Sequence, residues 1–283
     1  MVNVIIAIVK GGLGNQLFIY ATARALALRS GRVLYLDSKR GYTADAFGRS
    51  FLLDRFPIEA ERMPEAWRVA LHLKHPRHKL VRAWNKLLPR DWRGYLAENH
   101  HMGAEQITAL RPRCRQVTLL GYWQAEAYFV DQSDLIRSEL TPPVPDDERN
   151  RDLGRSLANY AETVFVHFRR VRYPQALSSD YYQRAITAAR AKLRSPRFVL
   201  FGDDLAWPMK VLDFGGASVE GVGHNGANEL ADLWLMSRCR HAIIANSSFS
   251  WWGAWLGPTR EGSVWAPAQP AVPLAFPQRW NLV

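Results

Sequence analysis

The sequence predicts an α/β protein of two domains, each built on a parallel sheet. Three observations support this: a strand–turn–helix–strand unit opens the chain, a proline-rich segment follows residue 140, and the alternation of strand and helix restarts after residue 162. At 283 residues the chain is long enough for two domains of ordinary size. We place these domains at residues 1–141 and 142–283.

The first domain opens with a strand, a glycine turn and a helix. Residues 2–9 are mostly valine, isoleucine and alanine, which is typical of a parallel strand buried on both faces. Residues 17–29 have apolar side chains at helical spacing, and Gly31 ends this helix. Residues 32–37 predict a second strand, which completes a βαβ unit.

The turn at residues 10–16, Lys-Gly-Gly-Leu-Gly-Asn-Gln, differs from the common phosphate-binding loops. Gly12 and Gly14 lack the third glycine of the dinucleotide fingerprint, and no Gly-Lys-Ser/Thr sequence follows. The turn still exposes backbone amides at a helix start, where Asn15 and Gln16 would be able to contact a ligand. A tight turn without a ligand is an equally good interpretation.

Positive charge gathers in the middle of the first domain. The chain has a net charge of +11, and residues 72–93 interleave Lys and Arg with Leu, Val and Trp. This stretch lies in an irregular, mostly helical segment from 41 to 115. It predicts either a solvated helical face or peripheral contact with an anionic membrane surface. It matches no nucleic-acid-binding module, so we expect no nucleic-acid partner.

A strand at 117–121 and a helix at 130–140 complete the first domain. The sequence Thr-Pro-Pro-Val-Pro-Asp-Asp follows at 141–147, and its three prolines cannot continue a helix or a central strand. In the second domain the pattern predicts helices at 180–193, from 229 and after 248, and strands at 163–168, 197–201, 211–214, 218–219, 241–245 and 263–266.

The sequence also bears on where the protein works. Its two cysteines, Cys114 and Cys239, form neither a disulfide framework nor a metal site. No apolar run reaches the roughly 20 residues that a membrane span needs. The opening residues lack the basic start of a signal peptide. We therefore expect a cytoplasmic protein, with peripheral contact at the inner membrane face.

Polar clusters follow three predicted strands of the second domain. They are His167-x-Arg169-Arg170, Asp203-Asp204 and Asn246-Ser247-Ser248. Because the carboxyl ends of parallel strands share one edge of a sheet, we expect these clusters to meet. Adjacent arginines suit bidentate contacts to phosphate, so the clusters predict a nucleotide-diphosphate pocket that uses arginine in place of a metal ion.

Each cluster also has a purely structural interpretation. The two arginines would form surface salt bridges, Asp203 would cap a loop, and the serines would cap the helix that follows them. Asp203 and Asp204 are adjacent and point in opposite directions on an extended chain, so they are not expected to chelate one metal ion.

Five segments together resemble a known family. They read GGLGNQLFIYATARALA, GYWQAEAYF, VHFRR, FGDD and ADLWLMSRCRHAIIANSSFSWWGAWL. The sequence is similar to the α-1,2-fucosyltransferases of glycosyltransferase family 11 from about residue 5 to residue 266. The last segment is long and very specific, whereas GGLGNQ is shared with related fucosyltransferase families.

The resemblance implies a GT-B fold, in which two Rossmann-like domains face each other across a cleft that holds the active site. It implies an inverting transfer of L-fucose from GDP-fucose to the 2-hydroxyl of a terminal galactose, without a divalent metal or another cofactor. The first domain would take the β-galactoside acceptor, and the second would bind the GDP-sugar. The implied donor-binding residues are His167, Arg169, Arg170, Asp203, Asn246, Ser247 and Ser248.

The resemblance also assigns roles to these residues. Arg169 or Arg170 would hold the β-phosphate and stabilise the departing GDP. Asp203 would accept hydrogen bonds from the guanine, with His167 beside the nucleoside. The two adjacent serines would hold phosphate oxygens. The loop at the cleft would comprise Gly12, Gly14, Asn15 and Gln16, and Asn15 would reach toward the acceptor.

One position departs from the family pattern. Family members usually read HxRRGDY, and this chain has Arg172 where the family has the aspartate. A substitute for that carboxylate would be Asp232 or Glu229, although Asp232 is as well explained by a structural role. The departure leaves two alternatives open: a pseudoenzyme that binds GDP or glycan, and a related transferase that uses a different sugar nucleotide.

Overall fold

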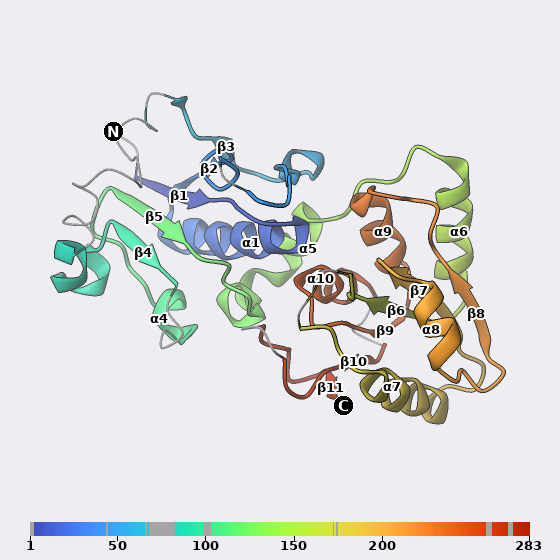
Figure 1. Ribbon diagram of the computed structural model, residues 1–283. Helices are drawn as coiled ribbons and strands as arrows, with labels where there is room; N and C mark the ends of the chain where they lie inside the picture. Colours follow the sequence, from blue (N-terminus) through green and yellow to red (C-terminus); the bar gives the residue numbers. More distant parts are fainter. Residues whose placement is uncertain are drawn as a thin grey trace. The chain divides into compact units, whose positions relative to one another are not determined.

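The computed structural model describes residues 3–43, 45–65, 67, 83–98, 103–171, 173, 175–258, 262–270 and 274–283 (Figure 1). The chain divides into two compact units, Met1–Leu140 and Thr141–Val283. The boundary predicted after residue 141 lies next to this division. Residues 72–82 of the basic stretch lie outside the described residues, as does Arg172.

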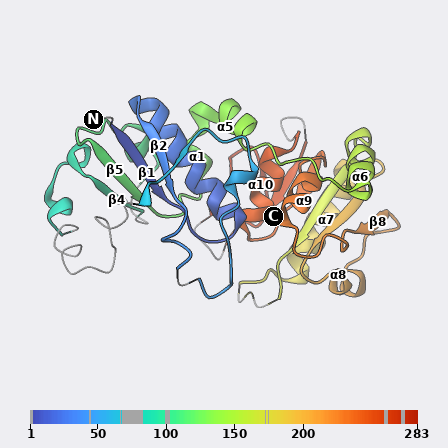
Figure 2. The same ribbon diagram turned by 90° about the horizontal axis from the view of Figure 1, so that it is seen from above.

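A five-stranded parallel sheet forms the N-terminal unit, in the order β3-β2-β1-β5-β4. Its strands are β1 (Val4–Ile8), β2 (Val33–Asp37), β3 (Glu61–Arg62), β4 (Tyr95–Ala97) and β5 (Gln116–Leu120). All five residues of β1 are buried, because this strand lies at the centre of the sheet. The helix α1 (Leu13–Ser30) packs along β1, as both ribbon views show (Figures 1 and 2).

The predicted βαβ unit is confirmed, with one change at its helix. The helix α1 begins at Leu13 inside the glycine turn, four residues earlier than the apolar periodicity indicated. It ends where predicted, because Gly31 adopts a left-handed conformation with φ of 60° and donates its N–H to the last carbonyls of the helix.

Within the described residues, the prediction of a mostly helical segment from 41 to 115 is not confirmed. They include the edge strands β3 and β4, the short helices η1 (Leu53–Arg55), η2 (Arg90–Trp92) and α4 (Glu105–Thr108), and helical residues at 83–87, whereas residues 68–82 lie outside the described part. Strands of two and three residues are too short to show the alternation that marks a strand in a sequence. The helix predicted at 130–140 is divided into η4 (Val130–Gln132) and α5 (Ser133–Glu139), and η3 (Glu126–Tyr128) precedes them.

A buried ion pair joins α1 to α5. The guanidinium of Arg24 donates to both carboxylate oxygens of Glu139, at 2.7 to 3.1 Å. The hydroxyl of Tyr20 donates to Glu139 at 2.5 Å and accepts the N–H of Glu59 at 3.0 Å. Burial raises the pKa of Tyr20, and the hydrogen bond to Glu139 raises it further, so this hydroxyl stays protonated.

A six-stranded parallel sheet forms the C-terminal unit, in the order β11-β10-β9-β6-β7-β8. Its strands are β6 (Thr163–Phe168), β7 (Arg197–Gly202), β8 (Ser218–Gly221), β9 (His241–Ile243), β10 (Val264–Ala266) and β11 (Asn281–Leu282). Its helices are α6 (Glu148–Asn159), α7 (Ser179–Lys192), α8 (Ala206–Val211), α9 (Glu229–Met236) and α10 (Ser248–Leu256).

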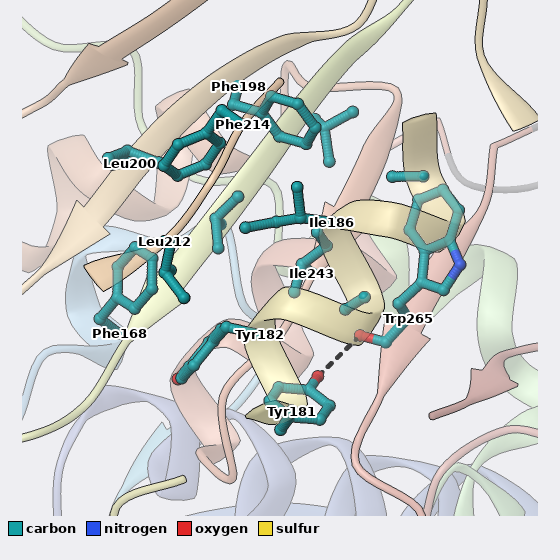
Figure 3. Close-up of a cluster of buried hydrophobic side chains, with 14 residues drawn as sticks. Phe168, Tyr181, Tyr182, Ile186, Phe198, Leu200, Leu212, Phe214, Ile243 and Trp265 are labelled. Atoms are coloured by element: carbon teal, nitrogen blue, oxygen red, sulfur yellow. Dashed lines mark hydrogen bonds between the residues drawn. The ribbon is translucent and has the colours of Figure 1, made fainter. Parts of the chain in front are cut away.

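The core of this unit lies between α7 and one face of the sheet (Figure 3). Tyr181, Tyr182 and Ile186 of α7 pack among large side chains of β6, β7, β9 and β10. Burying one such side chain contributes roughly 1.5–3 kcal/mol. The hydroxyl of Tyr181 donates to the carbonyls of Ile244 at 2.6 Å and Trp265 at 3.2 Å, so this buried polar group is satisfied.

Most predicted elements of this half are confirmed, and the strand predicted at 211–214 is wrong. Val211 ends α8. The backbone N–H and carbonyl of Asp213 both bond to the side-chain amide of Gln183, and not to a neighbouring strand. The pattern did not reveal α6, α8 or the edge strand β11. Within the part of the chain that the structure describes, no helix is both long enough and apolar enough to cross a membrane.

Candidate functional site

The three polar clusters of the second half lie at one edge of one sheet. Strands β9, β6 and β7 are neighbours and run parallel, with β6 in the middle. The chain continues from β6 to β7 on one side, whereas β9 lies on the other side. The boundary between β6 and β9 is therefore the point at which the strand order reverses, and ligands of open α/β sheets bind at such points.

Asp203 links the end of β7 to the end of β6. Its Oδ1 accepts the backbone N–H of Arg170 at 2.9 Å, and its Oδ2 lies 3.2 Å from the guanidinium of Arg169. The structure thus brings both arginines and Asp203 together, as the sequence predicted. Asp203 acts here as a loop cap that positions the arginines, and its contact with guanine stays a prediction.

A glycine permits this close approach. Gly202 has a φ of 151°, and a Cβ at this position would lie 2.3 Å from the carbonyl oxygen of Phe168. Any larger residue would therefore push the ends of β6 and β7 apart. Asp204 turns the other way and accepts the N–H of Trp207 at 3.1 Å, in the first turn of α8.

The guanidinium of Arg170 lies over the ring of Trp207, 3.6 Å from the ring centroid. Such stacking holds the planar fork in one orientation and leaves its edge available to an anion. Arg170 also donates to the carbonyl of Leu177 at 3.4 Å. The sequence analysis did not find Trp207, because nothing in the pattern of residues 205–211 links it to an arginine on another strand.

Tyr173 connects the arginine loop to the end of β9. Its hydroxyl donates to the carbonyl of Asn246 at 2.7 Å, and its ring centroid lies 5.8 Å from the guanidinium carbon of Arg169. Tyr182 supports β6 from the other direction by donating to the carbonyl of His167 at 3.1 Å. Neither tyrosine was predicted as part of the site.

Two buried side chains at the switch point keep polar atoms without partners. Asn246 is 1% exposed, and among the described residues neither its Nδ2 nor its Oδ1 has a hydrogen-bond partner. His167 is also buried, and its Nδ1 has no partner there either. A buried unpaired polar group costs about 1–3 kcal/mol, and a ligand bound at this edge would remove that cost. Contact of His167 and Asn246 with a ligand stays a prediction.

The environment of His167 fixes its charge. Burial, and then the positive charge of Arg169, lower the pKa of His167 to about 3. The imidazole is therefore neutral at physiological pH and can serve as a hydrogen-bond partner without adding charge. Its ring centroid lies 5.7 Å from that of Phe249 in the first turn of α10.

Ser247 caps α10, and its Oγ accepts the N–H of Phe249 at 3.3 Å. The capping interpretation of Ser247 is confirmed. Ser248 is the first residue of this helix. Contact of either serine with phosphate oxygens stays a prediction. Behind this turn, Trp251, Trp252 and Trp255 are fully buried and pack on one another, which fixes the helix that carries the serines.

Asp232 lies in a separate polar network. Its Oδ1 accepts the side-chain amide of Asn225 at 2.8 Å, and Asn225 in turn accepts from Asn150 of α6 at 2.7 Å. Burial raises the pKa of Asp232 to about 6, which suits a general base near neutral pH. Its hydrogen bonding is to this network and not to the arginines, so its catalytic role stays a prediction. Glu229 lies in the first turn of the same helix, α9.

Gln16 has a structural role in the glycine turn. It is fully buried, and its amide donates to the carbonyls of Gly11 at 3.1 Å and Ser50 at 2.8 Å. Its Oε1 accepts the N–H of Leu52 at 2.9 Å. The amide therefore holds residues 50–52 against the glycine turn, which is a structural role. Contact of Gln16 with a ligand stays a prediction.

Asn15 lies at the edge of the N-terminal sheet where its strand order reverses. β1 and β5 are neighbours, and the side-chain amide of Gln124, which follows β5, donates to the Oδ1 of Asn15 at 2.7 Å. Gly11 has a φ of 78°, and a Cβ there would lie 2.8 Å from the Nδ2 of Asn15. Gly12 immediately precedes α1, and Gly14 is buried within its first turn.

Lys10 is a further residue of this edge that the sequence analysis missed. Its ammonium lies 4.5 Å from the centroid of the Tyr122 ring. Burial lowers the pKa of Lys10, and the negative charge of Glu98 partly opposes this effect. Glu98 itself accepts the backbone N–H groups of Tyr122 at 2.6 Å and Trp123 at 2.9 Å. These bonds fix the turn that carries Gln124.

Comparison with known proteins relates these features to a family. The family model of glycosyl transferase family 11 matches residues 1–273. An alpha-1,2-colitosyltransferase of Escherichia coli is 28% identical over 90% of this chain and 88% of its own length. A galactoside alpha-(1,2)-fucosyltransferase 1 of Saimiri boliviensis boliviensis is 26% identical over 87% of this chain and 63% of its own length.

Structural similarity extends to a solved fucosyltransferase. The NodZ alpha-1,6-fucosyltransferase from Bradyrhizobium, co-crystallised with GDP, superposes with a TM-score of 0.52 at 17% identity, over 91% of this chain and 93% of that one. This similarity and the two parallel sheets confirm the predicted α/β fold of GT-B type with two Rossmann-like domains. Because the family model covers nearly the whole sequence, the chain belongs to glycosyl transferase family 11.

Proposed function

We propose that the protein transfers L-fucose from GDP-fucose to the 2-hydroxyl of a terminal galactose on a glycan. The transfer would proceed with inversion and without a divalent metal. The observation that supports this most directly is the edge of the C-terminal sheet. There, two arginines held by Asp203 and Trp207 lie beside the switch point that carries Asn246, whose amide has no partner in the described part of the chain.

The chemistry of the transfer explains why arginines suit this place. As the bond between the sugar and the diphosphate breaks, negative charge develops on the phosphate oxygens. Fixed guanidinium donors stabilise that charge without rearranging at the moment of reaction. Asp203 and Trp207 orient the donors in advance, and the neutral His167 adds a hydrogen-bonding group. Asn246 would contact the donor through its amide.

The names of the relatives support the linkage and the class of acceptor. The two curated relatives are described as an alpha-1,2-colitosyltransferase and a galactoside alpha-(1,2)-fucosyltransferase, so both form a 1,2-linkage. The galactoside named for the second supports a galactoside acceptor for this chain. GDP in the NodZ crystals supports a guanosine diphosphate donor.

The first of these relatives also favours a second candidate, the transfer of colitose. Colitose is fucose without its 3-hydroxyl, so a site that holds the nucleotide and the rest of the sugar would be able to accept either donor. A protein that binds GDP without turnover is the third outcome that the experiment must distinguish, because Arg172 replaces the family aspartate.

The test is mass-spectrometric detection of product. The purified protein is incubated with GDP-fucose or GDP-colitose and a panel of β-galactosides, with and without EDTA. We expect a mass gain of one fucosyl residue that EDTA does not abolish. A product formed only from GDP-colitose, lighter by one oxygen, would replace fucose with colitose in the proposal. Measurable GDP binding without any product would support the pseudoenzyme instead.

Asn246 gives a prediction that separates binding from folding. Asn246→Ala should weaken GDP binding or lower kcat/KM about 10- to 100-fold, because it removes a buried hydrogen-bonding group that the ligand would satisfy. The free energy of unfolding should change by less than about 1 kcal/mol, since the amide has no bond within the described chain to lose. Calorimetric titration with GDP and urea unfolding measure the two effects.

Asn150 is the matched control for this variant. It is also a buried asparagine, at 2% exposed, but its amide is bonded to Asp147, Asn225 and His224. Asn150→Ala should therefore destabilise the protein by about 1–3 kcal/mol. If Asn246→Ala destabilises the protein equally and leaves GDP binding unchanged, then Asn246 is a structural residue.

A further inference from the structure

A short segment of the N-terminal unit exposes large apolar side chains beside cations. Residues 83–87 are helical and are followed by η2. Trp84 is 70% exposed, Leu87 78% and Trp92 51%, and Leu88 is also exposed. We call these four residues, together with the exposed Lys86 and Arg113, the aromatic–basic patch. Trp84 and Leu87 are three residues apart in a helical turn and so share one face of it. Exposed apolar patches mark protein or membrane contacts.

The patch is held in place by specific hydrogen bonds. Asn85 is buried and exchanges two hydrogen bonds with the backbone of Tyr95 in β4, at 2.6 and 3.1 Å. Arg93 donates to the carbonyls of Leu88 at 2.9 Å and Lys86 at 3.0 Å. Because Asn85 is anchored to the sheet, its neighbours Trp84 and Lys86 are exposed to solvent. The exposure of the apolar groups is thus a consequence of a fixed local structure.

The charge around these apolar groups is positive. Asp91 is the only acidic residue between 83 and 93, and its carboxylate accepts the N–H of Arg111 at 3.1 Å. Lys86 is exposed, and the guanidinium of Arg113 lies 5.8 Å from the Trp92 ring centroid. Tryptophan and leucine enter the boundary between headgroups and acyl chains, while lysine and arginine attract anionic headgroups.

We propose that the aromatic–basic patch docks the protein on an anionic phospholipid surface. Trp84, Leu87 and Trp92 insert at the headgroup boundary, and the exposed Lys86 and Arg113 lie against the phosphates. Charge complementarity favours this partner over a second copy of the chain, because the patch would present its own positive charge to itself. The docking is independent of the proposed activity, since it uses no residue of the donor site.

The test is co-sedimentation of the full-length protein with phosphatidylcholine vesicles, with and without phosphatidylglycerol. The wild-type protein should bind the anionic vesicles and be released by high salt. The variant Trp84→Ser/Leu87→Ser/Trp92→Ser should bind about tenfold more weakly or worse, because the inserted side chains are removed. Lys86→Gln/Arg113→Gln should weaken binding about fivefold per charge, on anionic vesicles only.

The control is Val130→Ser/Leu135→Ser/Val144→Ser, which removes three other exposed apolar side chains. It should keep wild-type binding, and all variants should keep the wild-type Tm, because they change solvent-exposed groups. Equal binding by the patch and control variants would overturn the proposal. So would a lower Tm in the first variant, which would mean that the patch is packed within the chain. If the wild-type protein is a dimer without lipid and the patch variant is a monomer, the surface mediates self-association and the proposal is wrong. Binding of RNA that displaces the vesicles would also contradict the proposal.

Discussion

Replacing Arg170 with alanine should lower kcat/KM for sugar transfer about 100- to 1,000-fold, the usual effect of removing one donor to a developing charge. Arg170 is better fixed than Arg169. Its guanidinium stacks 3.6 Å from the Trp207 centroid, and its backbone N–H is held by Asp203. The side chain of Arg169 is 43% exposed and has one ion pair to Asp203. A preorganised donor contributes more to the transition state than a mobile one, so Arg170 should dominate.

Single-turnover and steady-state kinetics measure this effect, with product detected by mass. Arg170→Lys should recover only part of the activity, because an ammonium keeps the charge but loses the bidentate fork and its stacking on Trp207. The matched control is Arg194→Ala in the same unit, an exposed arginine whose backbone N–H, and not its side chain, bonds to Glu162. A tenfold or smaller effect of Arg170→Ala, equal to that of Arg169→Ala, would contradict the assignment.

Replacing Glu139 with alanine should destabilise the N-terminal unit by about 3–5 kcal/mol, since it leaves a buried charge without its main partner. The side chains of Arg24 and Glu139 are 10% and 7% exposed, and the other partner of Arg24, Glu59, is 77% exposed. Tyr20 would also lose its 2.5 Å hydrogen bond to Glu139. The guanidinium of Arg24 would then keep only the exposed Glu59 among these partners, and the hydroxyl of Tyr20 would lose the acceptor of its proton.

Urea unfolding of the full chain, followed by circular dichroism, measures this loss. The matched control is Glu65→Ala, which breaks the exposed ion pair to Lys39 in the same unit and should cost less than about 1 kcal/mol. The double variant Arg24→Met/Glu139→Leu should recover most of the lost stability, because apolar residues of similar volume remove the buried charges altogether. If Glu139→Ala costs no more than Glu65→Ala, water reaches the Arg24 site and the pair is not desolvated.

The sequence predicted those parts of the fold whose pattern is long and local. The run of apolar residues in β1 and the left-handed Gly31 fixed the first βαβ unit. β6 and β7 were predicted to within one residue, because full burial on both faces gives a continuous apolar run. The two-residue strands β3 and β11 were missed, since a strand of that length has no detectable period. Such strands form because a neighbouring strand offers hydrogen bonds, and only the tertiary structure places that strand alongside.

The site divides in the same way. The order of strand ends was enough to predict that Arg169, Arg170 and Asp203 lie at one edge, because parallel strands end together. The sequence did not distinguish the roles of Asn15 and Gln16, which are adjacent amides in one turn. Only the folded chain shows that Gln16 is bonded to residues 50–52, whereas Asn15 is joined to Gln124.

The sequence by itself therefore determined the family, the α/β class and the chemical types of the residues that end each strand. The tertiary structure decided which of those side chains bond within the fold: Asp203 holds two arginines and Trp207 orients one of them. Asn246 is buried, and its amide has no partner among the residues that the structure describes. The reason is physical. Periodicity and turn chemistry act over a few neighbouring residues, but a hydrogen-bond partner is chosen among groups that only long-range packing brings within about 3 Å.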